Sequence, residues 1–124
     1  MEKSAGVMER KVFLSWLLAF YGEMLTANQK EMARLYWEED LTLAEIADQF
    51  SVSRQSVHDT VSRTEKQLEG YEEKLGLLHR FRRMEEGLRA CREELGAVQA
   101  AGDTMPHLIA ARRWVDQLLD QEEQ

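Results

Sequence analysis

Apolar residues in the first part of the chain recur at the spacing of one helix face. They follow one another at intervals of four, three and four residues, which is the repeat of an α-helix: Phe13, Leu17, Phe20 and Met24. The pattern predicts a helix over about residues 8–24. Four more apolar side chains widen its face: Leu14, Trp16, Leu18 and Tyr21. So apolar a helix must be covered on more than one side, by the rest of the fold or by a second copy of the chain.

Three further helices are each preceded by a residue that caps helix N-termini. Thr26 with Gln29, and Thr42 with Glu45, have the spacing of a capping box, in which the two side chains bind each other's backbone N–H groups. Ser53 is the third cap and predicts a helix that begins directly after it. The three helices carry apolar residues at helical spacing, among them Met32, Leu35, Tyr36, Val57, Val61 and Leu68.

The stretch from about Thr42 to Lys66 has the pattern of a helix-turn-helix, in which two helices cross steeply over a short turn. Ala47 is small enough to let the second helix approach the first. We expect the corner between them to be filled by Ile46, Phe50, Val52, Val57 and Val61. Ser51 stands in the turn where such motifs often have glycine, so either it adopts a left-handed backbone or the turn is a variant.

The second helix of this motif carries the candidate functional residues. If it lies in a major groove, the side chains that the core does not use face outward, and seven of them suit nucleic acid: Ser53, Arg54, Gln55, Ser56, His58, Ser62 and Arg63. Glutamine pairs with adenine, arginine with guanine or phosphate, and serine with phosphate. Asp59 would be repelled by the backbone of the nucleic acid unless it pairs with Arg63, four residues on.

Beyond Gly70 the periodicity changes. Apolar residues alternate at spacings of four and three, typical of a helix that needs a partner helix; we call them the heptad stripe: Leu77, Phe81, Met84, Leu88, Cys91, Leu95 and Val98. A break at Gly102, Asp103 and Thr104 precedes a last helix with Pro106 in its first turn. That helix bears Leu108, Ala111, Val115 and Leu118 on one side. The two stripes predict an antiparallel pair within one chain, or a seam between two copies.

Composition supports an all-α fold throughout. The chain has one proline in 124 residues and few β-branched residues, so helix propensity is high nearly everywhere. We therefore predict two domains. Residues 1–70 form N-terminal helices with the helix-turn-helix, and residues 71–124 form a C-terminal helical hairpin that packs on the first part or on a second copy.

Charge and cysteine content narrow the function. Lys and Arg number 16 against 23 Asp and Glu, a net charge of −7, whereas isolated DNA-binding domains are usually basic. A helix-turn-helix kept for protein contacts, or as a structural oligomer, is therefore an alternative to nucleic-acid binding.

The lone Cys91 fits a reducing compartment, so we expect a cytoplasmic protein. The apolar run over residues 12–21 is too short to span a membrane, and no membrane insertion is expected.

The sequence offers no candidate for catalysis. His58, His79 and His107 lie far apart and share no zinc-ligand spacing with cysteine or carboxylate. Neither a glycine-rich phosphate loop nor a nucleophile elbow is present. We expect no enzyme activity, cofactor, metal or small-molecule substrate. The basic cluster over residues 79–83 either pairs with nearby glutamates on its own helix or adds phosphate contacts.

Residues from about Trp16 to Leu78 resemble the YlxM-like family of helix-turn-helix proteins, small bacterial proteins encoded beside signal recognition particle genes. The resemblance is carried by Phe20-Tyr21, Leu25-Thr26-x-x-Gln29, Leu35-Tyr36, Leu43 to Ala47, Val52 to Gln55, Asp59, Arg63 to Lys66, Leu68-Glu69-x-Tyr71-Glu72 and Lys74-Leu75. The sequence departs from the family at Ser51, where the family tends to glycine, and at His58, where it tends to tyrosine.

This resemblance implies a helix-turn-helix similar to region 4 of bacterial sigma factors, and no catalytic residues. It also implies a role in, or regulation of, the signal recognition particle pathway. We therefore hypothesise a homodimeric regulatory protein that binds DNA or RNA. The alternative is an accessory protein of the signal recognition particle that acts through protein contacts without nucleic acid.

Overall fold

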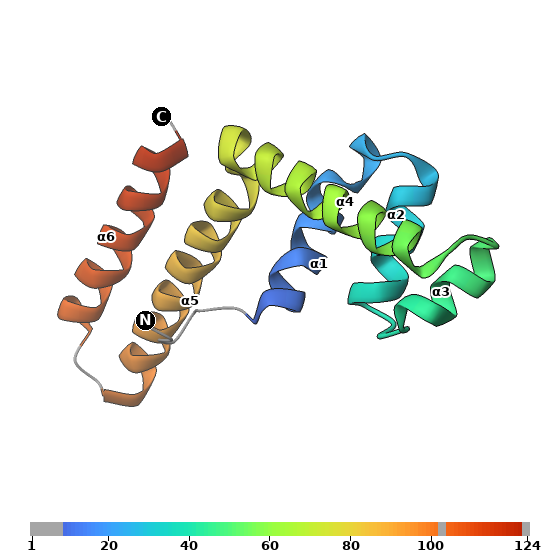
Figure 1. The fold of residues 1–124 in the computed structure, drawn as a ribbon. Helices are drawn as coiled ribbons and strands as arrows, with labels where there is room; N and C mark the ends of the chain where they lie inside the picture. Colours follow the sequence, from blue (N-terminus) through green and yellow to red (C-terminus); the bar gives the residue numbers. More distant parts are fainter. Residues whose placement is uncertain (1–8, 102–103, 123–124) are drawn as a thin grey trace. The chain divides into compact units, whose positions relative to one another are not determined.

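The computed structural model describes residues 9–101 and 104–122. Regular structure in these residues is helical: α1 (Arg10–Tyr21), the 3-10 turn η1 (Gly22–Met24), α2 (Ala27–Trp37), α3 (Leu43–Phe50), α4 (Arg54–Leu75), α5 (Leu77–Ala101) and α6 (Met105–Glu122) (Figure 1). The predicted all-α fold with a helix-turn-helix is confirmed. The chain forms two compact units, the first ending at Leu78 and the second beginning at His79.

The boundary between the units lies later than the predicted division after Gly70. Gly70 is inside α4, which continues to Leu75. Gly76 then ends the helix with a φ of 64°, a left-handed backbone that glycine adopts without a steric penalty. A new helix, α5, begins at the next residue, so the stretch from Gly70 to Ala101 is divided between two helices and is not one bent helix. Whether the two parts fold as separate domains stays a prediction.

Both predicted capping boxes form. The Thr26 hydroxyl accepts from the Gln29 backbone N–H at 3.2 Å, and the Gln29 side chain accepts from the Thr26 N–H at 3.1 Å. The box at Thr42 repeats this arrangement at 3.1 and 2.8 Å. Ser53 caps α4 by accepting from the backbone N–H three residues later at 3.0 Å. Local sequence therefore sets where α2, α3 and α4 begin.

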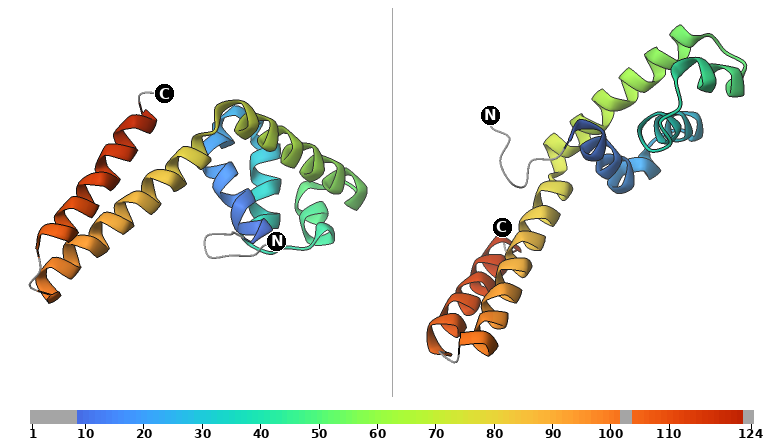
Figure 2. Two further views of the ribbon diagram at one scale, coloured as in Figure 1. Left: turned by 90° about the vertical axis from the view of Figure 1, so that its left-hand side faces the viewer. Right: turned by 90° about the horizontal axis from the view of Figure 1, so that it is seen from below.

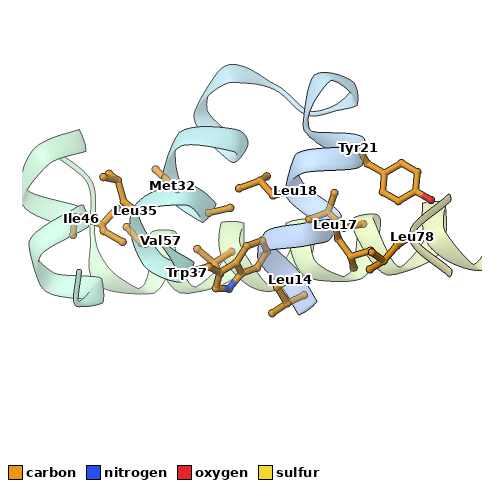
Figure 3. Close-up of a cluster of buried hydrophobic side chains, with 14 residues drawn as sticks. Leu14, Leu17, Leu18, Tyr21, Met32, Leu35, Trp37, Ile46, Val57 and Leu78 are labelled. Carbon is orange, nitrogen blue, oxygen red and sulfur yellow. The ribbon is translucent and has the colours of Figure 1, made fainter. Parts of the chain in front are cut away.

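In the first unit, α1, α2 and α3 pack against the long α4, and α2 also packs against α1 and α3. Each of the four helices contributes a side chain with no exposed surface or nearly none: Leu17, Met32, Ile46 and Val57 (Figure 3). Burial of such a side chain contributes roughly 1.5–3 kcal/mol. Because three helices converge on α4, its outward surface is held at a defined orientation to α3.

The apolar stripe predicted on the first helix is partly wrong. Leu17 is buried, but Met24 is 50% exposed, because α1 ends at Tyr21 and the 3-10 turn η1 changes the direction of the next side chains. The deepest positions besides Leu17 are Leu14, Leu18 and Tyr21. The predicted start at residue 8 lies outside the described residues.

Tyr21 joins α1 to the turn between α4 and α5. Its hydroxyl donates to Glu72 Oε1 at 2.6 Å and accepts from the backbone N–H of Leu77 at 3.1 Å. Glu72 Oε1 also accepts from the backbone N–H of Leu78 at 3.1 Å. Two N–H groups that the first turn of α5 leaves without helical partners are thereby satisfied. Burial, and then the hydrogen bond to Glu72, raise the pKa of Tyr21.

The second unit contains an antiparallel pair of helices, as predicted. Figures 1 and 2 show α5 and α6 side by side, running in opposite directions. Glu94 Oε1 and His107 Nδ1 are 2.9 Å apart, and the Cys91 thiol donates to the Ala111 carbonyl at 3.4 Å. The predicted break at Gly102 and Asp103 lies outside the described residues.

The heptad stripe divides between two environments. In α5, Cys91 is buried, whereas Leu88 and Leu95 are 56% and 50% exposed. In α6, Ala111 and Leu118 are likewise buried, whereas the other two predicted positions, at residues 108 and 115, are 42% and 45% exposed. The hairpin therefore buries only one edge of each predicted stripe.

Candidate nucleic-acid interface

The interface is built on the turn between α3 and α4. Ser51 has φ 56° and ψ 46°, so the left-handed alternative is the correct one. The N–H of Val52 reaches back to the Ala47 carbonyl at 3.1 Å, which closes the end of α3. A non-glycine residue in this conformation costs on the order of 1 kcal/mol. This unfavourable conformation occurs where the chain changes direction between α3 and α4.

The corner under the turn is apolar and closely packed. Ile46 and Val57 are fully buried, Val61 is 5% exposed and Ala47 is 4% exposed. Val52 was also expected to fill the corner, and this is wrong. It is 40% exposed, because the left-handed residue before it directs the chain outward at that point.

The structure brings together some of the seven candidate residues and separates others. Five are exposed, and Ser56 and Ser62 are half-buried. At 100° per residue, Arg54, Gln55, His58 and Ser62 lie along one side of α4, close to its N-terminus. Ser56 and Arg63 lie roughly half a turn away from Arg54.

A shallow hollow of about 540 Å³ opens on this side. It is lined by Arg54, Gln55 and His58 of α4, and by Leu43 at the start of α3. Leu43 was not among the residues predicted from the sequence. Leu43 lines the hollow because α3 crosses α4, and no local sequence pattern specifies that crossing.

Asp59 pairs with its neighbours on α4 and not with Arg63. Its Oδ1 accepts from Gln55 Nε2 at 2.9 Å and lies 3.4 Å from His58 Nδ1, so the pairing with Arg63 that would offset its repulsion from nucleic acid does not form. Within residues 9–101 and 104–122, the guanidinium groups of Arg54 and Arg63 form neither a hydrogen bond nor an ion pair. Both guanidinium groups are therefore available to an anionic ligand, while Gln55 must leave Asp59 to read a base with its amide nitrogen.

Charges of both signs surround the hollow. The exposed cations on this part of α4 are Arg54, Arg63 and Lys66. Three exposed carboxylates lie on α3 and on the same part of α4: Glu45, Asp48 and Asp59. A phosphate backbone would meet a few cations here rather than a broad basic surface.

The described residues offer neither a metal centre nor a membrane-spanning helix. In the described part of the chain, no three His, Cys, Asp or Glu side chains gather where they could hold a metal ion. None of the helices described is both long and apolar enough to cross a membrane.

The short α3, the left-handed turn and the polar outer side of α4 define a helix-turn-helix protein. A family model described as "Putative helix-turn-helix protein, YlxM / p13 like" matches residues 8–103. The chain belongs to this family, UPF0122. Helix-turn-helix families are typical of nucleic-acid binding, and the description of this one names no reaction.

Relatives in Bacillus are similar over most of the chain. A UPF0122 protein of Bacillus pumilus (strain SAFR-032) is 45% identical over 86 residues, which cover 69% of this chain and 78% of the relative. UPF0122 proteins of Bacillus cereus (strain AH187) and Bacillus anthracis (strain A0248) are each 34% identical over 110 residues, covering 89% of this chain and all of the relative.

Proposed function

We propose that this protein is a nucleic-acid-binding regulator, not an enzyme, and that it acts in the cytoplasm in the signal recognition particle pathway. The observation that carries the proposal is the N-terminal part of α4, where Arg54 is exposed beside a hollow shared with α3 and forms no ion pair with any residue that the structure describes. The link to the signal recognition particle rests on the resemblance to a family encoded beside its genes.

In this proposal the first turns of α4 enter a major groove. Ser53 and the backbone N–H groups at the start of α4 contact phosphate, where the helix dipole favours an anion. Arg54 contacts a guanine edge or a phosphate, and Gln55 an adenine edge. Ser62 and Arg63 contact phosphates further along the groove. Two copies of the chain bind together, since a dimer can place two such helices on successive half-sites.

Replacing Arg54 with alanine is the test of this interface. We expect the variant to lose affinity by about 5- to 150-fold, equivalent to roughly 1–3 kcal/mol for one arginine contact. Gel shifts against cognate promoter DNA and signal recognition particle RNA, each at several salt concentrations, measure the loss. If Arg54 contacts phosphate, the slope of log affinity against log salt concentration becomes less steep by about one, the share of one phosphate contact.

The matched control is Arg113→Ala. Arg113 is an exposed arginine in α6, outside the helix-turn-helix, and its loss removes the same charge from the chain. Affinity should then stay close to that of the parent protein. Binding that is insensitive to salt, or equal losses in both variants, would contradict the proposed interface.

The net charge of −7 favours a second candidate function. Here the protein is an accessory of the signal recognition particle that contacts a basic protein surface without nucleic acid. It predicts that the purified chain retains the particle's GTPase when RNA is absent. Retention that nuclease treatment abolishes would count against this candidate and in favour of binding through RNA.

A further inference from the structure

The second unit exposes a set of aliphatic side chains that its own hairpin does not cover. Leu88 and Leu95 belong to α5, and Met105, Leu108, Val115 and Leu119 to α6; we call these six residues the apolar hairpin face. Their exposed fractions lie between 42% and 63%. Single exposed leucines are ordinary on protein surfaces, but six on adjacent helices call for a physical account.

The six residues lie on the same side of the hairpin. In α5, Leu88 and Leu95 stand three residues before and four residues after the buried Cys91. In α6, Leu108 and Val115 stand three before and four after the buried Ala111. Each exposed stripe is thus turned by about 40–60°, in the same sense, from the buried residue of its helix, and Leu119 and Met105 lie about 80° and 120° from Ala111 in that sense. Because the helices are antiparallel, equal turns of this kind bring both stripes to one side.

Contacts within the hairpin place these residues in layers. Cys91 bonds to Ala111 and Glu94 faces His107, so residues whose numbers add up to about 202 lie at the same level. By this register Leu95 lies beside Leu108, and Leu88 beside Val115. The face therefore has the two-helix width and the layered spacing of one half of a four-helix bundle.

The interior of the hairpin is small. Among the described residues its buried side chains are Cys91, Ala111 and Leu118, and the last of these lies over Gly87, which has no side chain. The opposite side carries polar groups, where Arg83, Glu86 and Gln117 line a hollow with Trp114. A two-helix unit with so little buried apolar area is too small to be stable by itself, and units of this size commonly gain their core by association.

We propose that the apolar hairpin face packs against the same face of a second copy, forming a four-helix bundle. Six side chains of which about half is exposed, with their borders, approach the roughly 800 Å² per partner of a standard interface. Charge permits self-association, since residues 79–124 carry 7 basic and 9 acidic side chains. Arg92 and Arg112 border the face together with Glu85, which pairs with Arg89 at 3.4 Å, so charges of both signs lie along its edge and a two-fold arrangement can bring opposite charges together.

This inference names the surface through which the two copies of the proposed function contact each other. It rests only on the part of that proposal which states that two copies bind together. Its test uses no nucleic acid, so the two proposals fail separately. A monomer in solution would overturn the bundle and leave the Arg54 interface standing. A dimer that binds no nucleic acid would do the reverse.

The test is light scattering coupled to size-exclusion chromatography on the full chain. The parent protein is expected to have twice the 14.4 kDa mass of one chain. With Leu88→Glu and Leu119→Glu combined, two charges enter the face, and we expect dissociation to a monomer with at least 100-fold weaker association. Leu88→Met with Leu119→Met keeps the face apolar and should preserve the dimer.

Ile109→Glu is the matched control, because Ile109 is 53% exposed on α6 but lies outside the face. It should remain a dimer. Thermal unfolding adds a measurement that needs no variant, since the midpoint of a dimer rises with protein concentration. A monomeric parent protein, a midpoint independent of concentration, or a dimer that survives the two glutamates would overturn the proposal.

Discussion

Replacing Ile46 with alanine is expected to lower the free energy of unfolding of the first unit by about 2–5 kcal/mol, the range for large-to-small changes in a packed core. Ile46 is the fully buried residue of α3, and the short helix has few other anchors. Small domains are stable by only about 5–15 kcal/mol, so much of the stability is at stake. Urea unfolding of the full chain, followed by circular dichroism, measures the change.

Two neighbouring substitutions calibrate this result. Ile46→Val removes one methylene and should cost about 0.5–1.5 kcal/mol. Val52→Ala changes an aliphatic residue in the adjoining turn that is 40% exposed, and it should have an effect within roughly 0.5 kcal/mol. Equal losses at positions 46 and 52 would show that the corner of the helix-turn-helix is not packed as described.

Replacing Gly87 with leucine should open the hairpin of the second unit. A Cβ atom at Gly87 would lie 2.7 Å from Leu118 Cδ2 and 2.9 Å from two other atoms of that side chain, so even a methyl group requires Leu118 to move. A whole leucine cannot be accommodated without separating the helices, and overpacking of this kind costs about 1–3 kcal/mol or more. Earlier thermal unfolding and faster limited proteolysis of α6 are the expected readouts.

Gly96→Leu is the matched control, since a Cβ there meets no atom of the described residues within 4 Å, apart from its chain neighbours and the backbone of its own helix. It should be neutral or stabilise α5 by up to about 1 kcal/mol, because leucine favours helix over glycine. Combining Gly87→Leu with Leu118→Ala should recover part of the loss, as expected for two groups in contact. Failure of this recovery would contradict the contact between α5 and α6 at Gly87.

Most of the local features of the molecule could be predicted from the sequence. The capping boxes at Thr26 and Thr42, and the cap at Ser53, involve side chains within three residues of the backbone groups they bind. The alternation of apolar and polar positions along each helix likewise depends only on residues three or four positions apart. These interactions act between neighbours in the chain, so the order of the helices and the helix-turn-helix could be recognised without coordinates.

The candidate site could be predicted only in outline. The outward residues of α4 follow from helical periodicity, and Arg54, Gln55 and His58 do line a common hollow. The partner of Asp59 could not be chosen from the sequence, because several side chains four residues or fewer away compete for one carboxylate. Which of them binds it depends on side-chain conformation rather than on spacing.

Other features required the packed molecule, because they join segments that are distant in the sequence. Tyr21 and Glu72 are 51 positions apart, yet together they hold the start of α5. The heptad stripe of α5 predicts an apolar surface, but only the register with α6 decides that Cys91 is covered and Leu88 is not. Periodicity shows which side chains share a helix face, whereas the packing of one helix against another determines which face is buried.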